Sequence, residues 1–347
     1  MSDLRFDPVT HQWVSIAENR RNRPVEFAPV EQARHQVICP FCAGNEDETP
    51  PALAEFDAEL QPLSPPVDAD EVNAWSVRVV PNKYPAFEGT GIDPKTNTGP
   101  FRTANDFGVQ ELIVPTPRHV ATIGELDCDE LKRALHVARL RIANLKETDG
   151  IEHAMLFMNC RMEAGASIEH THLQLLGSPI ISRSLESRVE ISDAYYRDNH
   201  QSLVQRIVEW ESSQNKRVVK TTNNFSMFCP FASRQPLTVW IAPAETPEPF
   251  VDSGHLIDEL AELCHEAVLK IESLLERPAY NLLLHQQPFK SEGPDHWYLE
   301  IFPRMTKQAG YEGAPIFGSI PLLQKRQPSD CVPQESKQRS RVGCCYC

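Results

Sequence analysis

The stretch NCRMEAGASIEHTHLQ, residues 159–174, holds a turn of small residues followed by a His-x-His-x-Gln pattern. The apolar runs AMLFMNC at 154–160 and HTHLQLL at 170–176 are typical of half-buried strands. Because alternate side chains of a strand share a face, we expect His170, His172 and Gln174 to lie on one face. Two imidazoles and a carboxamide make a poor apolar face but a suitable site for phosphate chemistry.

The elements around this stretch recur later in the chain. Residues 125–147 and 254–276 place apolar side chains at helical spacing, so each segment predicts a helix with one buried face. Each helix has matching neighbours, which are CPFC and VQELIVP before the first, CPFAS and LTVWIAP before the second, and two further apolar runs after each. The repeated order predicts an α+β fold, built as a duplicated unit with a mostly antiparallel sheet and packed helices.

Composition bounds the class of protein. The 347 residues, of which 41% are hydrophobic and 24% charged, are enough for two domains of ordinary size or one large one with a buried core. We expect an N-terminal domain over 1–190, a C-terminal domain over 191–325 and a disordered polar tail over 326–347. The net charge of −14 counts against a nucleic-acid binder. No run predicts a membrane span or a signal peptide, so we expect a cytoplasmic protein with reduced cysteines.

Cys39 and Cys42 form a CxxC pair, which can hold one tetrahedral zinc ion if two further ligands are supplied. His119, which follows a predicted strand, and His170 are the best-placed candidates. Ordinary reduced thiols in a turn are the alternative. A redox pair is disfavoured because the motif does not open a helix after a strand.

His172 is a candidate nucleophile. A neutral imidazole can attack phosphorus and form a phosphoramidate, which divides a transfer into two steps. The phosphoryl oxygens then need hydrogen-bond donors, and the amides of 165–167, Ser167 and Gln174 can supply them. A surface strand with two solvated histidines, or a simple metal site, is the alternative.

Taken together, these stretches resemble the galactose-1-phosphate uridylyltransferase family of the histidine triad superfamily. The resemblance extends from about residue 4 to about residue 312. It is carried by RFDPVTHQWVSIAENRRNRP, CPFCAGNEDETPP, VRVVPNKYPAF, NCRMEAGASIEHTHLQ, CPFASRQPLTVWIAP, HWYLEIFPR and AGYE. It implies two histidine-triad-like units, nucleotide-sugar and sugar 1-phosphate substrates, and a homodimer.

The resemblance also implies residue roles. His172 would carry the nucleotidyl group, and Gln174 would hydrogen-bond a phosphoryl oxygen. A structural zinc ion would be bound by Cys39, Cys42, His119 and His170. Substrate would be contacted by Arg20, Arg23, Asn82, Asn159, Ser167 and Glu312. Solvated surface charge is the alternative for the arginines and for Glu312.

The second half is predicted to be chemically silent, because Ala232 stands where a second thiolate would be needed and Glu300 stands in the place of Gln174. Some family members hold a second metal in this half, for which His285, His296 and Glu186 are candidates. Structural histidines are the favoured interpretation. The tail cysteines Cys344, Cys345 and Cys347 are expected to be inert.

Two departures from the family pattern affect the substrate. Thr171 stands where uridylyltransferases have proline, and related ADP-sugar phosphorylases have a small hydroxyl residue there. The segment after Gly-Tyr-Glu does not match either group well. The expected reaction is transfer of a nucleoside monophosphate between sugar 1-phosphates, with UDP-glucose as the donor and galactose 1-phosphate as the acceptor. The alternatives are an ADP-sugar or dinucleotide phosphorylase that uses inorganic phosphate, and a non-catalytic zinc-stabilised nucleotide-binding protein.

Overall fold

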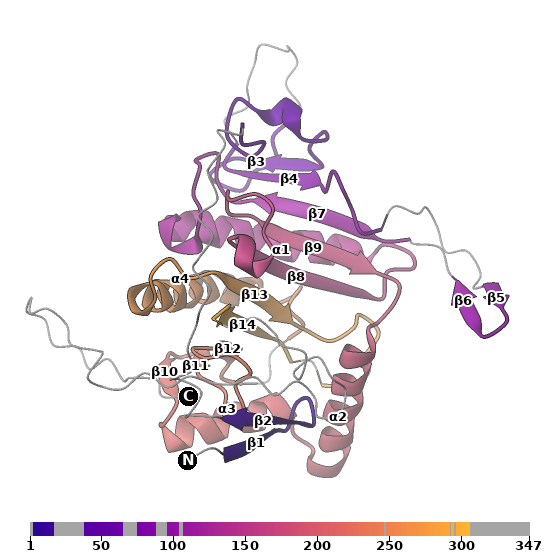
Figure 1. Cartoon of the computed structure of the whole chain (residues 1–347), viewed down its shortest axis with the longest axis vertical. Coiled ribbons are helices and arrows are strands. Elements are labelled where there is room, and N and C mark those ends of the chain that lie inside the picture. Colours follow the sequence, from indigo (N-terminus) through magenta and orange to yellow (C-terminus); the bar gives the residue numbers. More distant parts are fainter. Residues whose placement is uncertain are drawn as a thin grey trace, which may run out of the picture.

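A computed structural model describes residues 3–16, 38–64, 75–87, 96–103, 107–245, 248–291, 293–294 and 296–305. Arg20, Arg23, Glu312 and the tail from 326 lie outside the described residues. The main feature is a ten-stranded sheet with strand order β10-β11-β12-β14-β13-β8-β9-β7-β4-β3, which runs the length of the molecule (Figure 1). All neighbouring strands in this sheet are antiparallel, as the sequence predicts.

The two halves of the chain contribute the two halves of this sheet. The first half supplies β3 (Ala54–Phe56), β4 (Val77–Pro81), β7 (Val109–Val114), β8 (His153–Cys160) and β9 (Leu173–Ser178). The second supplies β10 (Val218–Thr221), β11 (Phe225–Phe228), β12 (Val239–Pro243), β13 (Tyr280–His285) and β14 (Tyr298–Pro303). They join where β8 pairs with β13, so the predicted duplication is confirmed in an α+β fold. The division into two domains stays a prediction.

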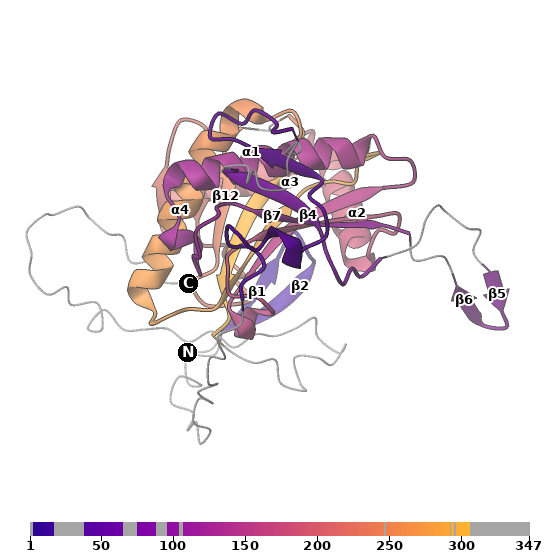
Figure 2. The same cartoon turned by 90° about the horizontal axis from the view of Figure 1, so that it is seen from above.

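The two predicted helices lie side by side on one face of the sheet (Figures 1 and 2). They are α1 (Cys128–Lys146) and α4 (Ile257–Leu274), each somewhat shorter than the amphipathic segment because a 3-10 turn precedes it. Asp127 and Glu130 form a capping box that begins α1. Apolar side chains of both helices and of the facing strand positions form the largest hydrophobic core.

The opposite face is covered unevenly. On this face of the second half of the sheet, α3 (Leu203–Gln214) packs Val204 and Val208 against Trp240 and Tyr298. The neighbouring α2 (Arg183–Asn199) and the hairpin of β1 (Asp3–Asp7) and β2 (Gln12–Ile16) belong to this side. A separate small hairpin pairs β5 (Thr96–Thr98) with β6 (Phe101–Thr103).

A second apolar cluster lies on this same face, opposite α1 and α4, which is called the open face below. It includes Phe41, Trp75 and Leu112 of the first half. The strip of sheet between the two clusters carries the polar residues of interest. Burial along β8 alternates, with Met158 and Cys160 on the helix side and Asn159 on the open side. In the part of the chain that the structure describes, no helix is long and apolar enough to span a bilayer.

One detail of the prediction is corrected. Strand β9 begins at Leu173, so His170 and His172 precede it and only Gln174 lies within it. The reason is that Thr171 donates its backbone N–H to Val120 O, at 2.7 Å, instead of to a sheet neighbour. The two histidines therefore lie in an extended segment at the strand's entrance.

Candidate active site

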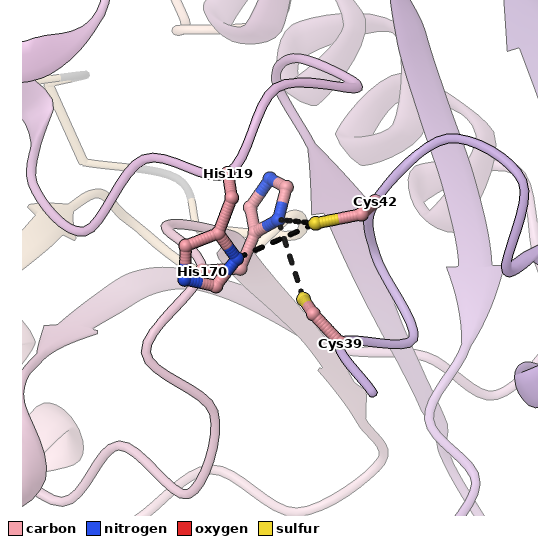
Figure 3. Close-up of side chains that lie close together, drawn as sticks. All are labelled: Cys39, Cys42, His119 and His170. Atoms are coloured by element: carbon pink, nitrogen blue, oxygen red, sulfur yellow. Dashed lines mark hydrogen bonds between the residues drawn. The ribbon is translucent and has the colours of Figure 1, made fainter. Parts of the chain in front are cut away.

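Four predicted ligand side chains meet at one point. The turn at 39–42, in which Cys42 N–H donates to Cys39 O at 3.3 Å, brings both thiols to one side. His119 comes from the segment after β7, and His170 from the segment before β9 (Figure 3). One ligand atom from each lies within 4.8 Å of all the others. The arrangement can hold a metal ion, and it is the one such cluster among the described residues.

The distances match a tetrahedral site. His170 Nδ1 lies 3.5 Å from Cys39 Sγ and 3.7 Å from Cys42 Sγ, and His119 Nδ1 lies 3.4 Å from Cys42 Sγ. Metal–sulfur and metal–nitrogen bonds of typical zinc length, at a tetrahedral angle, separate S and N by about 3.6 Å. Two thiolates and two imidazoles are a donor set that suits zinc.

The state of His170 also suits coordination. Its Nε2–H donates to the carbonyl of Thr116 at 3.1 Å, so Nδ1 carries the lone pair and faces the thiols. Burial, with His119 and His172 nearby, lowers the pKa of His170 to about 4, which keeps the ring neutral. In contrast, burial and the neighbouring Cys39 raise the pKa of Cys42 to about 11. A bound cation would therefore be needed to hold both sulfurs as thiolates.

His172 is held with one nitrogen committed and one available. It is 5% exposed, and its Nδ1–H donates to the backbone carbonyl of His170 at 2.8 Å. The carbonyl can only accept, so Nε2 carries the lone pair. Burial lowers the pKa of His172, which favours the neutral ring. The rings of Phe41 and His172 pack edge to face, with their centroids 5.0 Å apart. These features suit a nucleophile.

Gln174 is oriented by a neighbour on β7. Ala86 N–H donates to Gln110 Oε1 at 2.8 Å, and Gln110 Nε2 donates to Gln174 Oε1 at 3.3 Å. This polarity leaves the NH2 group of Gln174 as the free end, which is the donor that a phosphoryl oxygen requires. Asn82 follows β4 directly and donates its backbone N–H to Gln110 O at 2.9 Å.

The loop between β8 and β9 has a strained start. Arg161 has φ 70° and Gly165 has φ 98°, and Ala164 and Ala166 both donate their N–H groups to Arg161 O at 3.1 Å. Such a backbone is costly for arginine and is held by these hydrogen bonds. The loop leaves Ser167 exposed, three positions before His170 in the chain. Asn159 lies at its base, on the open face of β8.

Among the described residues, His285, His296 and Glu186 form no cluster that could hold a second metal ion. His285 lies between Arg188 Nη1, at 2.6 Å, and Glu300 Oε2, at 2.7 Å. His296 instead contacts Gln287 and the Pro294 carbonyl. Each therefore has hydrogen-bond partners within the protein, and their interpretation as structural histidines stays a prediction.

Sequence reasoning missed four neighbours that orient the predicted residues: Thr116, Gln110, Phe41 and Asn281. Phe41 and Asn281 carried a signal, because Phe41 lies inside the CxxC motif and Asn281 lies in the strand that repeats β8. Thr116 acts through its backbone, which no sequence pattern marks.

Comparison with known proteins agrees with this geometry. A family model described as galactose-1-phosphate uridyl transferase, N-terminal domain, matches residues 1–182, and a model of a domain of unknown function (DUF4921) matches residues 115–318. ADP-glucose phosphorylase of Arabidopsis thaliana is 29% identical over 323 residues, which are 89% of this chain and 86% of the relative. Galactose-1-phosphate uridylyltransferase of Thermotoga maritima is 24% identical over 303 residues, 86% of this chain and 85% of the relative.

Solved structures show the same fold. A crystal structure of an ADP-glucose phosphorylase from Arabidopsis thaliana with bound ADP-glucose has a TM-score of 0.74 at 24% identity, covering 93% of this chain and 94% of that one. A galt-like protein from the same plant has a TM-score of 0.70 at 26% identity, covering 94% and 96%.

The duplicated fold and the relatives define an enzyme of the nucleotidyltransferase class. More narrowly, the chain belongs to the galactose-1-phosphate uridylyltransferase family of the histidine triad superfamily.

Proposed function

We propose that this protein is a nucleotide-sugar phosphorylase, which transfers AMP from an ADP-sugar to inorganic phosphate through His172. The observation that carries the proposal is the hydrogen bond from His172 Nδ1 to the His170 carbonyl, which leaves the Nε2 lone pair available for attack on phosphorus. From the sequence alone, the favoured substrates are UDP-glucose and a hexose 1-phosphate. The 29% identity to an ADP-glucose phosphorylase, together with Thr171, supports the phosphorylase alternative better.

The reaction has two displacements at the α-phosphorus. In the first, Nε2 of His172 forms an N–P bond, and the bond from phosphorus to the bridging oxygen breaks, so that the sugar 1-phosphate leaves with that electron pair. In the second, an oxygen of inorganic phosphate forms a P–O bond, the N–P bond breaks and ADP leaves. The NH2 groups of Gln174 and Asn159 stabilise negative charge on the α-phosphoryl oxygens in both steps.

The metal centre has a structural part in this proposal. Cys39, Cys42, His119 and His170 would hold a zinc ion with all four positions filled by protein, which leaves no open position for substrate. The ion would fix the His170 backbone, whose carbonyl orients the His172 ring. Arg20, Arg23, Asn82, Ser167 and Glu312 are proposed to bind nucleotide, phosphates and sugar.

A second candidate is uridylyl transfer from UDP-glucose to galactose 1-phosphate, by the same chemistry with a different acceptor. The match of residues 1–182 to the uridyl transferase family model and the 24% identity to the Thermotoga maritima enzyme support it. A nucleotide-binding protein without turnover is the third interpretation. A cytoplasmic homodimer remains a prediction, which sedimentation and cell fractionation can check.

One panel separates these candidates. ADP-glucose and UDP-glucose are each incubated with protein plus either phosphate or galactose 1-phosphate, and the nucleotide products are separated by chromatography. The proposal predicts ADP from ADP-glucose and phosphate as the fastest reaction. UDP-galactose as the main product would replace it with the second candidate, and nucleotide binding without any product would favour the third.

A further inference from the structure

A chain of hydrogen bonds leads from the second half of the protein to the base of the active-site loop. Arg304, which follows β14, donates from Nε to Oδ1 of Asn281 on β13. Asn281 in turn donates from Nδ2 to Asn159 Oδ1 at 2.7 Å and to Ala164 O at 2.9 Å. Asn281 and Asn159 are also the facing pair in the register of β13 and β8, where the two halves of the sheet join.

The polarity of this chain is set at its outer end. A guanidinium has only donors, so the oxygen of Asn281 faces Arg304 and its NH2 group faces Asn159. The NH2 group of Asn281 donates to Oδ1 of Asn159. The NH2 group of Asn159 is therefore directed away from Asn281 and toward the loop. A Cβ placed on Gly165 would lie 3.5 Å from Asn159 Nδ2, so the amide borders this glycine of the loop.

The amide of Asn281 has little freedom to turn over. It is 5% exposed, and a reversed amide would bring its oxygen against two acceptors, Asn159 Oδ1 and Ala164 O. A buried polar group that loses its partners in this way is costly. The arrangement is thus consistent only when donors and acceptors alternate from Arg304 to Asn159.

Arg304 has no carboxylate partner among the described residues, unlike Arg161 and Arg277, which both lie within 4.0 Å of Glu169. Its guanidinium lies over the Phe302 ring at 5.0 Å, and partial burial lowers its pKa. Among the described residues, the side-chain hydrogen bond of Arg304 goes to Asn281.

We propose that Arg304 and Asn281 are positioning residues, which fix the Asn159 amide with its NH2 group toward the phosphoryl group carried by His172. The inference rests on the proposed function. It gives the second half a part in the reaction, although Tyr298 occupies the place of His172 in the repeated motif. Neither residue touches substrate in this account, because both act through Asn159.

The test is a double-mutant cycle scored on the rate of nucleotidyl-protein formation from ADP-glucose in a single turnover. Arg304→Met removes the outer donor, Asn281→Asp makes the middle position an acceptor, and Asn159→Ala removes the end of the chain. Arg304→Lys keeps a donor, and Arg183→Met, at an exposed site on α2, is the matched control. Metal content and melting temperature are measured for each variant, so that a folding defect is recognised.

The expected result is a rate lowered about 100-fold by Asn281→Asp, at the lower end of the range for a lost oxyanion donor. Arg304→Met should lower it about 10-fold, less than the loss of a donor, because the Asn159 amide stays in place but is less firmly oriented. Neither change lowers the rate further when Asn159 is already alanine, since the affected amide is gone. Arg304→Lys retains most of the rate, and Arg183→Met retains all of it. The proposal is overturned if the two changes lower the rate equally in the wild-type and Asn159→Ala backgrounds, or do not lower it at all. It is also overturned if the losses follow the melting temperature and not the presence of the donor.

The proposed function can fail separately. If the wild-type protein forms no adduct, the function is wrong, and the same cycle is scored on AMP affinity by calorimetry. The positioning inference predicts the same dependence on Asn159 there. A wild-type protein with neither adduct nor AMP binding overturns both.

Discussion

The Nε2–H of His170 donates to the carbonyl of Thr116 at 3.1 Å, and this bond decides which ring nitrogen faces the two thiols. The backbone carbonyl of His170 in turn accepts from His172 Nδ1 at 2.8 Å. The side chain of one residue therefore serves the candidate metal centre while its main chain orients the candidate nucleophile. Loss of the metal should affect both stability and the orientation of the His172 ring.

We expect purified protein to contain one zinc ion per chain, which Cys42→Ser removes. The melting temperature should fall by about 10 °C, because a structural metal contributes several kcal/mol to folding. Cys128→Ser, at a partly buried thiol on α1 outside the cluster, is the control and should keep the metal. Metal analysis combined with thermal unfolding checks this. Wild-type protein that is fully folded with reduced thiols and no metal would rule out the structural role.

Gln110→Glu should slow nucleotidyl transfer about 100-fold, in the range for loss of one donor to a developing oxyanion. The introduced carboxylate can accept from Ala86 N–H but can no longer donate to Gln174 Oε1. Gln174 would turn its own NH2 group toward that carboxylate and present an oxygen to the phosphate.

Single-turnover rates measure this effect, and Gln61→Glu, at an exposed turn, is the matched charge control. If Gln110→Glu is no slower than Gln61→Glu, the orientation of Gln174 does not depend on its neighbour.

The free energy of unfolding should fall as the pH is lowered from about 6.5 toward 4. Burial, followed by the nearby Arg188 and His285, lowers the pKa of His153 from 6.5 to about 4, and burial lowers that of His296 to about 4 as well. Between these values the unfolded chain binds protons that the folded chain does not, so acid favours unfolding. Denaturant titrations at several pH values in this window give the free energy of unfolding. Its dependence on pH should be less steep for His153→Leu than for wild type. An unchanged slope would show that His153 is not the source.

The sequence predicted those parts of the fold that repeat. The helices α1 and α4 and the strands around them were found because apolar side chains recur with a helical or alternating period and in the same order twice. The helices α2 and α3 were not predicted. In α2 only Leu185 and Ser192 are buried, so it lacks a continuous apolar stripe that a pattern could reveal.

The site was predicted to a similar depth. Residues whose side chains are proposed to carry the chemistry, such as Cys39, Cys42, His170 and His172, were identified from motifs and family resemblance. Residues that orient them were not, because a carbonyl such as that of Thr116 is independent of side-chain identity. The pairing of Asn159 with Asn281 depends on the register of strands 122 positions apart in the chain, which local patterns do not specify.

The central claim is that the Nε2 atom of His172 becomes covalently nucleotidylated. The most direct test is intact-protein mass spectrometry after incubation with ADP-glucose or UDP-glucose in the absence of acceptor, quenched in alkali because phosphoramidates are acid-labile. We predict a gain of one nucleoside monophosphate, larger with ADP-glucose, that maps to His172 and is lost in His172→Ala but kept in His255→Ala, at an exposed histidine. Turnover without an adduct, or an adduct that survives His172→Ala, would contradict the account.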